Sequence, residues 1–103
     1  MSWDSTHEWW RALHDVAAEI ENRRDGELPW RAEHAAVFGD PGGLIAALRY
    51  RWNLMVRAHE DELAGADGEA RERELIEANQ GVLQVLRAAG HHEPAAVPAF
   101  AAA

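Results

Sequence analysis

The chain has 103 residues, of which 48% are hydrophobic, and this length suits one domain with a single core. Ten arginines and no lysine stand against 18 acidic residues, and the resulting formal net charge of -8 repels the phosphates of nucleic acids. The absence of cysteine excludes disulfides, thiolate nucleophiles and thiolate-bound metals, and the absence of lysine excludes a Schiff base. We expect no cofactor and no direct contact with nucleic acid.

The remaining side chains favour a protein without catalytic activity. The aliphatic hydroxyls, Ser2, Ser5 and Thr6, all lie at the amino end, where a positioned nucleophile is not expected. The first residues lack the basic start and apolar run of a secretory signal. No apolar stretch approaches the roughly 20 residues that span a bilayer. We expect a non-enzymatic cytoplasmic protein without membrane contact.

Two helices are predicted in the first part of the chain. Residues 5–8 read Ser-Thr-His-Glu, a capping box, which predicts a helix from Ser5 to about Arg24 that ends before Gly26. Pro29 in a first helical turn predicts a short second helix through Phe38. The apolar stripe of the first helix contains Trp9, Trp10, Leu13, Val16, Ala17 and Ile20.

Two further helices are expected to form an antiparallel hairpin. Asp40 as N-cap begins a helix that runs from Pro41 to about Ala64, and Asp67 begins another that runs to Ala89 and ends on Gly90. The third helix has a stripe of Leu44, Ile45, Leu48, Trp52, Met55, Val56, His59 and Leu63. The fourth has Leu75, Ile76, Asn79, Val82, Leu83 and Leu86.

These elements predict an all-α fold, an irregular four-helix bundle of three long helices and one short helix. Residues 1–90 are expected to form a single helical domain. Residues 91–103 are rich in alanine and proline and are expected to be a flexible tail. Its last four residues, Phe-Ala-Ala-Ala, resemble the alanine-terminated tails that bacterial unfoldase-proteases recognise.

Polar residues interrupt three of the stripes: His34, His59 and Asn79. If the hairpin turns near residue 66, two residues lie opposite each other along the antiparallel helix axes when their numbers add to about 131. We therefore predict that the His59 imidazole donates to the Glu72 carboxylate and that the Trp52 indole donates to the Asn79 carbonyl. One interpretation is a satisfied polar core that fixes the register of the hairpin, and the other is a ligand pocket with a carboxylate-oriented imidazole.

The histidines and tryptophans allow sharper alternatives. Six histidines could ligate a metal, but no Glu-x-x-His or His-Glu-x-x-His motif is present, and we expect no native metal site. Five tryptophans suit a small helical core. Trp10 lies at the edge of the first stripe and Trp3 precedes the predicted helix cap, and both are candidates for a contact surface.

Three classes of function follow from these observations. The missing nucleophiles, together with apolar edges at Leu54 and at Ala78 and Val85, favour a non-catalytic protein-interaction or regulatory module. We expect a protein partner, with a homodimer as a further outcome of the same apolar surplus. A bundle that binds a small ligand or metal around His34, His59 and Glu72 is the first alternative. The second is an acidic inhibitor of a nucleic-acid enzyme, built on Glu69, Glu72, Glu74 and Glu77.

Overall fold

The computed structural model describes residues 3–90, and this range contains α-helices and one 3-10 helix with no strand. The all-α fold class is confirmed. No helix within this range is long and apolar enough to cross a membrane. The predicted tail, residues 91–103, lies outside the described residues. The elements are α1 (Trp3–Arg23), η1 (Ala32–His34), α2 (Ala35–Phe38), α3 (Pro41–Ala58), α4 (Glu60–Ala64), α5 (Gly68–Ala78) and α6 (Gln80–Ala88).

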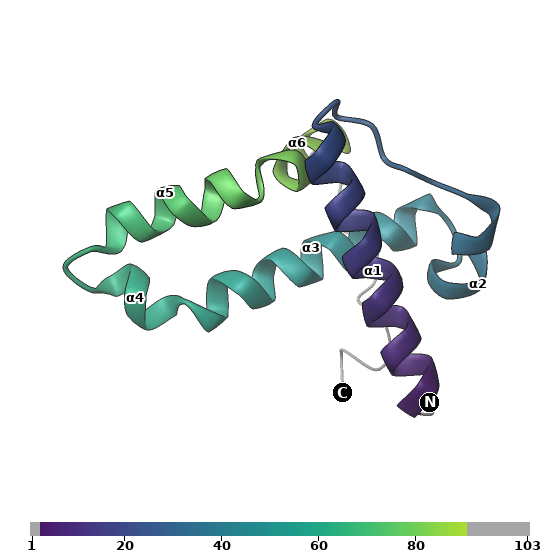
Figure 1. Ribbon diagram of the computed structural model, residues 1–103, viewed down its shortest axis with the longest axis horizontal. Coiled ribbons are helices and arrows are strands. Elements are labelled where there is room, and N and C mark those ends of the chain that lie inside the picture. The colour runs from purple at the N-terminus through teal and green to yellow at the C-terminus, as the bar shows by residue number, and fades with distance from the viewer. Residues whose placement is uncertain (1–2, 91–103) are drawn as a thin grey trace.

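The hydrophobic core lies where α1 crosses the first half of α3, with α2 and α6 packed at its sides (Figure 1). The predicted stripe of α1 is buried except for Trp10, whose ring is partly exposed and packs edge-on against Trp9 with centroids 4.8 Å apart. The buried members of the cluster are Trp9, Leu13, Val16, Ala17, Ile20, Phe38, Leu44, Ala47, Leu48, Val82, Val85 and Leu86.

The starts of the first two helices differ from the prediction. Helix α1 begins at Trp3, so Ser5 lies inside the first turn and is not the N-cap. The second helix does not begin at Pro29, which is buried in an extended segment. The backbone N–H of Arg31 donates to Nδ1 of His34 at 3.0 Å, and helical structure begins only after Arg31, which is the N-cap. A bond from the N-cap amide to the side chain three residues later is one half of a capping box, and it fixes the helix start at this point.

Other predicted boundaries are confirmed. The Asp40 carboxylate accepts from the Gly43 amide at 2.7 Å and Pro41 occupies the first turn of α3. Gly90 follows α6 with a φ of 89°, the left-handed conformation expected after a helix. Asp67 is the N-cap of α5, although its side chain makes no capping hydrogen bond.

Both long helices of the hairpin are interrupted, which the sequence pattern did not predict. At His59, ring Nδ1 bonds the Met55 carbonyl at 2.7 Å, and the His59 amide bonds Val56 instead. At Asn79, Nδ2 donates to the Leu75 carbonyl at 2.9 Å, and its backbone amide bonds residue 76. In each case a side chain takes the carbonyl four residues earlier, which the helix would otherwise use for its own ladder. One mechanism therefore separates α3 from α4 and α5 from α6.

The hairpin projects beyond the core as an extension that we name the distal arm, residues 54–78. Figure 1 shows it to the left, away from α1, α2 and α6, with the turn between α4 and α5 at its tip. The radius of gyration is 14.3 Å, which exceeds the value of about 13 Å for a compact domain of this length. The excess reflects the arm.

Candidate functional site

The distal arm contains no core of its own. From Leu54 to Ala78, Gly68 is the buried residue, and the larger apolar side chains are all partly exposed, with Ile76 at 39%. None of them belongs to the core or packs against it. The predicted stripes of the hairpin are therefore buried near α1 and only partly covered along the arm. The partly exposed apolar residues of the arm are Leu54, Met55, Val56, Leu63, Leu75 and Ile76.

Acidic side chains surround these apolar residues. The arm contains eight carboxylates and three arginines, so it holds a charge of -5. Arg71 bridges Glu62 of α4 and Glu74 of α5 at 3.3 and 3.1 Å. A hollow of about 260 Å³ lies beside this bridge, with Leu75 and Ala78 on its apolar side. The arm thus combines an open apolar surface with a strongly negative potential.

The predicted pair of His59 and Glu72 is not formed. The His59 ring bonds its own helix at the Met55 carbonyl, and because a carbonyl oxygen only accepts, Nδ1 carries the proton. Glu72 is exposed and makes no hydrogen bond or ion pair within residues 3–90. The expected register was nearly right, since Glu62 meets Arg71 across the hairpin. The break at residue 59 interrupts the continuous helix face that the predicted pairing requires.

The predicted pair of Trp52 and Asn79 is also wrong. Asn79 is buried, but its Oδ1 accepts from Nη1 of Arg51 at 3.5 Å and its Nδ2 donates to Leu75. Trp52 instead packs against the core and lines a pocket with Leu83. Burial lowers the pKa of the Arg51 guanidinium, and the charge of Glu21 partly offsets this effect. Asn79 is therefore a bond partner for a half-buried arginine.

Of the other predicted site residues, His34 and Trp10 pack against aromatic side chains. His34 is 8% exposed, stacks near Trp30 and accepts at Nδ1, so its proton lies on Nε2. Within residues 3–90 the His34 ring contacts Arg31, Trp30 and Phe38, and it makes no contact with His59, Glu72 or Asn79. Trp10 packs on Trp9 and Tyr50. The side chain of Trp3 lies outside the described structure.

The junction of α1 and α6 is a polar contact that the sequence reasoning missed. The Glu21 carboxylate accepts from the amides of Gly81 at 3.1 Å and Val82 at 2.8 Å, in the first turn of α6. Arg24 donates to Glu21 at 3.2 Å and to the Glu77 carbonyl at 3.1 Å. α1 therefore caps α6 and closes the end of α5. Asn79 is a residue type that often caps helices, but its side chain makes no capping bond to α6, so no local signal in the sequence pointed to Glu21.

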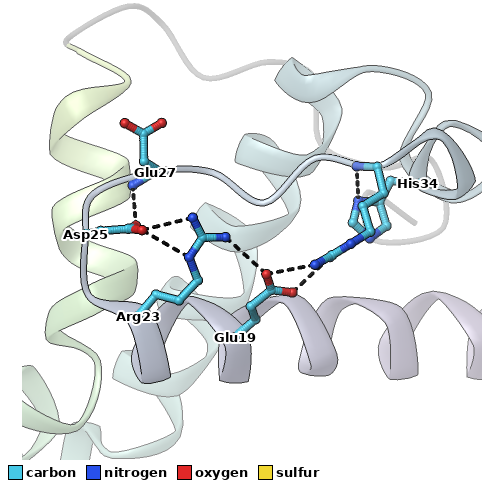
Figure 2. Close-up of polar contacts among 6 residues, drawn as sticks. Glu19, Arg23, Asp25, Glu27 and His34 are labelled. Atoms are coloured by element: carbon cyan, nitrogen blue, oxygen red, sulfur yellow. Dashed lines mark hydrogen bonds and ion pairs between the residues drawn. The ribbon is translucent and has the colours of Figure 1, made fainter.

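A second polar network fastens the segment between α1 and η1. Figure 2 shows Arg23 between Glu19 and Asp25, and Glu19 also accepts both Nη atoms of Arg31 at 2.9 Å. The hydrogen bond from Arg31 lowers the pKa of Glu19, and the Glu27 amide lowers the pKa of Asp25. Their carboxylates raise the pKa of Arg23 and Arg31 above the ordinary arginine value. The network positions the loop, and the charges of Glu19, Arg23, Asp25 and Arg31 are all paired within it.

A pocket of about 320 Å³ lies between α3 and α6. Nε of Arg49 is buried without a hydrogen-bond partner, and the Arg87 guanidinium has no partner within residues 3–90. A buried donor without an acceptor costs about 1–3 kcal/mol. The pocket is lined by Arg49, Trp52, Asn53, Leu83, Leu86, Arg87 and Gly90.

Within residues 3–90, no group of three or more histidine, aspartate or glutamate side chains is arranged to hold a metal ion. Comparison with known proteins finds no matching family model, no similar curated sequence and no similar solved structure.

Proposed function

We propose that the protein is a non-catalytic interaction module whose distal arm binds the partner. The observation that supports this is the missing core of the arm, where six large apolar side chains remain partly exposed. Helices obtain most of their stability from packing of an apolar face, and this hairpin has no third helix to supply it. A partner that covers the arm would provide the missing packing.

The charge of the arm selects the chemistry of the partner. The arm contributes -5 of the formal charge of -8, so a second copy of the chain would bring the same negative charge to the interface. A basic amphipathic helix fits better, because its apolar face can cover the leucines while its lysines or arginines meet the surrounding carboxylates. The predicted homodimer thus becomes the competing outcome of the test.

The test uses the full-length protein, labelled with ¹⁵N, and a synthetic peptide of about five helical turns with leucine on one face and lysine elsewhere. Two control peptides have the same composition in scrambled order, or glutamate in place of lysine. We expect saturable amide shifts in residues 54–78 with the first peptide only. Affinity should fall as salt is raised.

Substitutions in the arm identify the docking surface. Leu63→Gln and Ile76→Gln each remove an apolar contact and should weaken peptide binding about tenfold, which corresponds to about 1.4 kcal/mol. Ala18→Gln, at an exposed position of α1, is the control and should bind like the native chain. Equal binding of the scrambled peptide, or shifts centred on α1, would overturn the proposal.

Sedimentation of the free protein decides between a foreign partner and a second copy. We expect a monomer whose mass does not change with concentration. A dimer that Ile76→Gln dissociates would keep the arm as an interface but would overturn the assignment to a basic partner.

A further inference from the structure

The pocket between α3 and α6 is basic in an acidic chain. Arg49 of α3 and Arg87 of α6 line it, and no carboxylate does. The other described pockets each contain at least one glutamate. Its volume of about 320 Å³ lies at the lower end of the range for small-ligand sites, about 300–1,000 Å³.

The two guanidinium groups of this pocket have no carboxylate partner within residues 3–90, whereas several other arginines of this range form ion pairs. Arg23 and Arg71 each contact two carboxylates, and Arg31 binds both oxygens of the Glu19 carboxylate. In contrast, neither pocket arginine has an ion-pair or hydrogen-bond partner among residues 3–90, and Nε of Arg49 is shielded from water as well. An arginine fork in this state offers the bidentate geometry that matches an oxyanion.

The positions of Arg49 and Arg87 within their helices show which of the two charges is already stabilised by the protein. Arg87 lies in the last turn of α6, where the helix dipole favours a cation without any ligand. Arg49 lies within α3 and has no such compensation. Two like charges at one pocket also repel each other, and an anion between them would remove that repulsion.

The other residues that line the pocket indicate the chemistry of the uncharged part of a ligand. Trp52, Leu83 and Leu86 form an apolar wall beside the two arginines. The formal charge of -8 disfavours multiply charged anions, whereas a single negative charge is repelled least. We propose that this pocket binds a monocarboxylate attached to an apolar body, with the carboxylate between Arg49 and Arg87. This site is separate from the arm surface, and each proposal can fail without the other.

The test follows side-chain N–H signals of the full-length chain during titration. Decanoate, below the concentration at which it forms micelles, is the probe, and the signals are the Nε–H of Arg49 and the indole N–H of Trp52. Acetate supplies the charge without the body, and decanol supplies the body without the charge. We expect saturable shifts with decanoate and at least tenfold weaker binding of either control compound.

Arginine variants complete the design. Arg49→Gln and Arg87→Gln should each weaken decanoate binding at least tenfold. Arg73→Gln removes the same charge from an exposed position of α5 and should leave binding unchanged. The proposal is overturned if decanoate gives no saturable shift, if decanol or acetate binds equally well, or if both pocket variants bind like the native chain.

Discussion

Removing the Glu21 carboxylate is expected to detach α6 from α1. This carboxylate is the cap of α6, because Asn79, the residue before the helix, makes no capping bond. A helix cap contributes about 1 kcal/mol and at most about 2, and a hydrogen bond to a charged group about 1.5–3. The side chain is 22% exposed, so water replaces part of what is lost. Glu21→Ala should therefore lower the free energy of unfolding by about 2 kcal/mol.

Urea denaturation followed by tryptophan fluorescence measures this loss. Asp15→Ala is the control, since it removes a carboxylate from an exposed position of the same helix and should change stability by less than about 0.5 kcal/mol. Glu21→Gln retains one acceptor oxygen and should lie between the two variants. Hydrogen exchange gives a local readout, because the amides of Gly81 and Val82 should lose protection first in Glu21→Ala. Unfolding at the same urea concentration as Asp15→Ala would refute the capping role.

Three further predictions concern close packing, charge and the helix breaks. Gly81→Ala places a Cβ 2.8 Å from the Ile20 carbonyl oxygen. This overpacking should lower the free energy of unfolding by about 1–3 kcal/mol despite the gain in helix propensity. A variant more stable than the native chain in urea denaturation would contradict the close crossing of α1 and α6. The folded-state pKa of Glu19 is lowered, so its contribution is present at neutral pH and lost as the pH falls through that value. Urea midpoints at about pH 6 and about pH 3 should therefore differ less in Glu19→Gln than in the native chain, and equal differences would rule the contribution out. His59→Ala frees the Met55 carbonyl and should join α3 to α4, as ¹³Cα shifts of residues 57–61 would report; unchanged shifts would mean that the ring does not cause the break.

Periodicity predicted which residues belong to the core, but not how far along each helix the core extends. The stripe of α1 is buried almost throughout, as expected. The same spacing continues into the arm, where Leu63 and Ile76 stay partly exposed. A stripe shows which face of a helix is apolar, whereas burial depends on whether another element covers it. The start of the second helix was placed too early, at Pro29, for a similar reason, because Pro29 is buried in a non-helical segment.

Predictions for the polar site were less successful than those for the core. The register of the hairpin was nearly right because the turn fixes axial height. The partners of His59 and Asn79 were wrong because both side chains bond their own helices, and local bonding of this type competes with contacts across the hairpin. The Glu21 cap spans elements far apart in the sequence, and no local spacing rule could have placed it.

The two helix breaks give the arm unequal attachments to the core. α3 passes from the core into the arm without interruption as far as Ala58, so this side of the arm is continuous with the core. On the other side, α5 meets α6 at Asn79, and Glu21 and Arg24 of the α1 end hold that meeting point. A partner that moves α5 would therefore strain the hydrogen bonds of Asn79 and Glu21 before it changes the position of α3. If the arm is the docking element, Glu21→Ala should change peptide affinity as well as stability, since it loosens the base on which α5 rests.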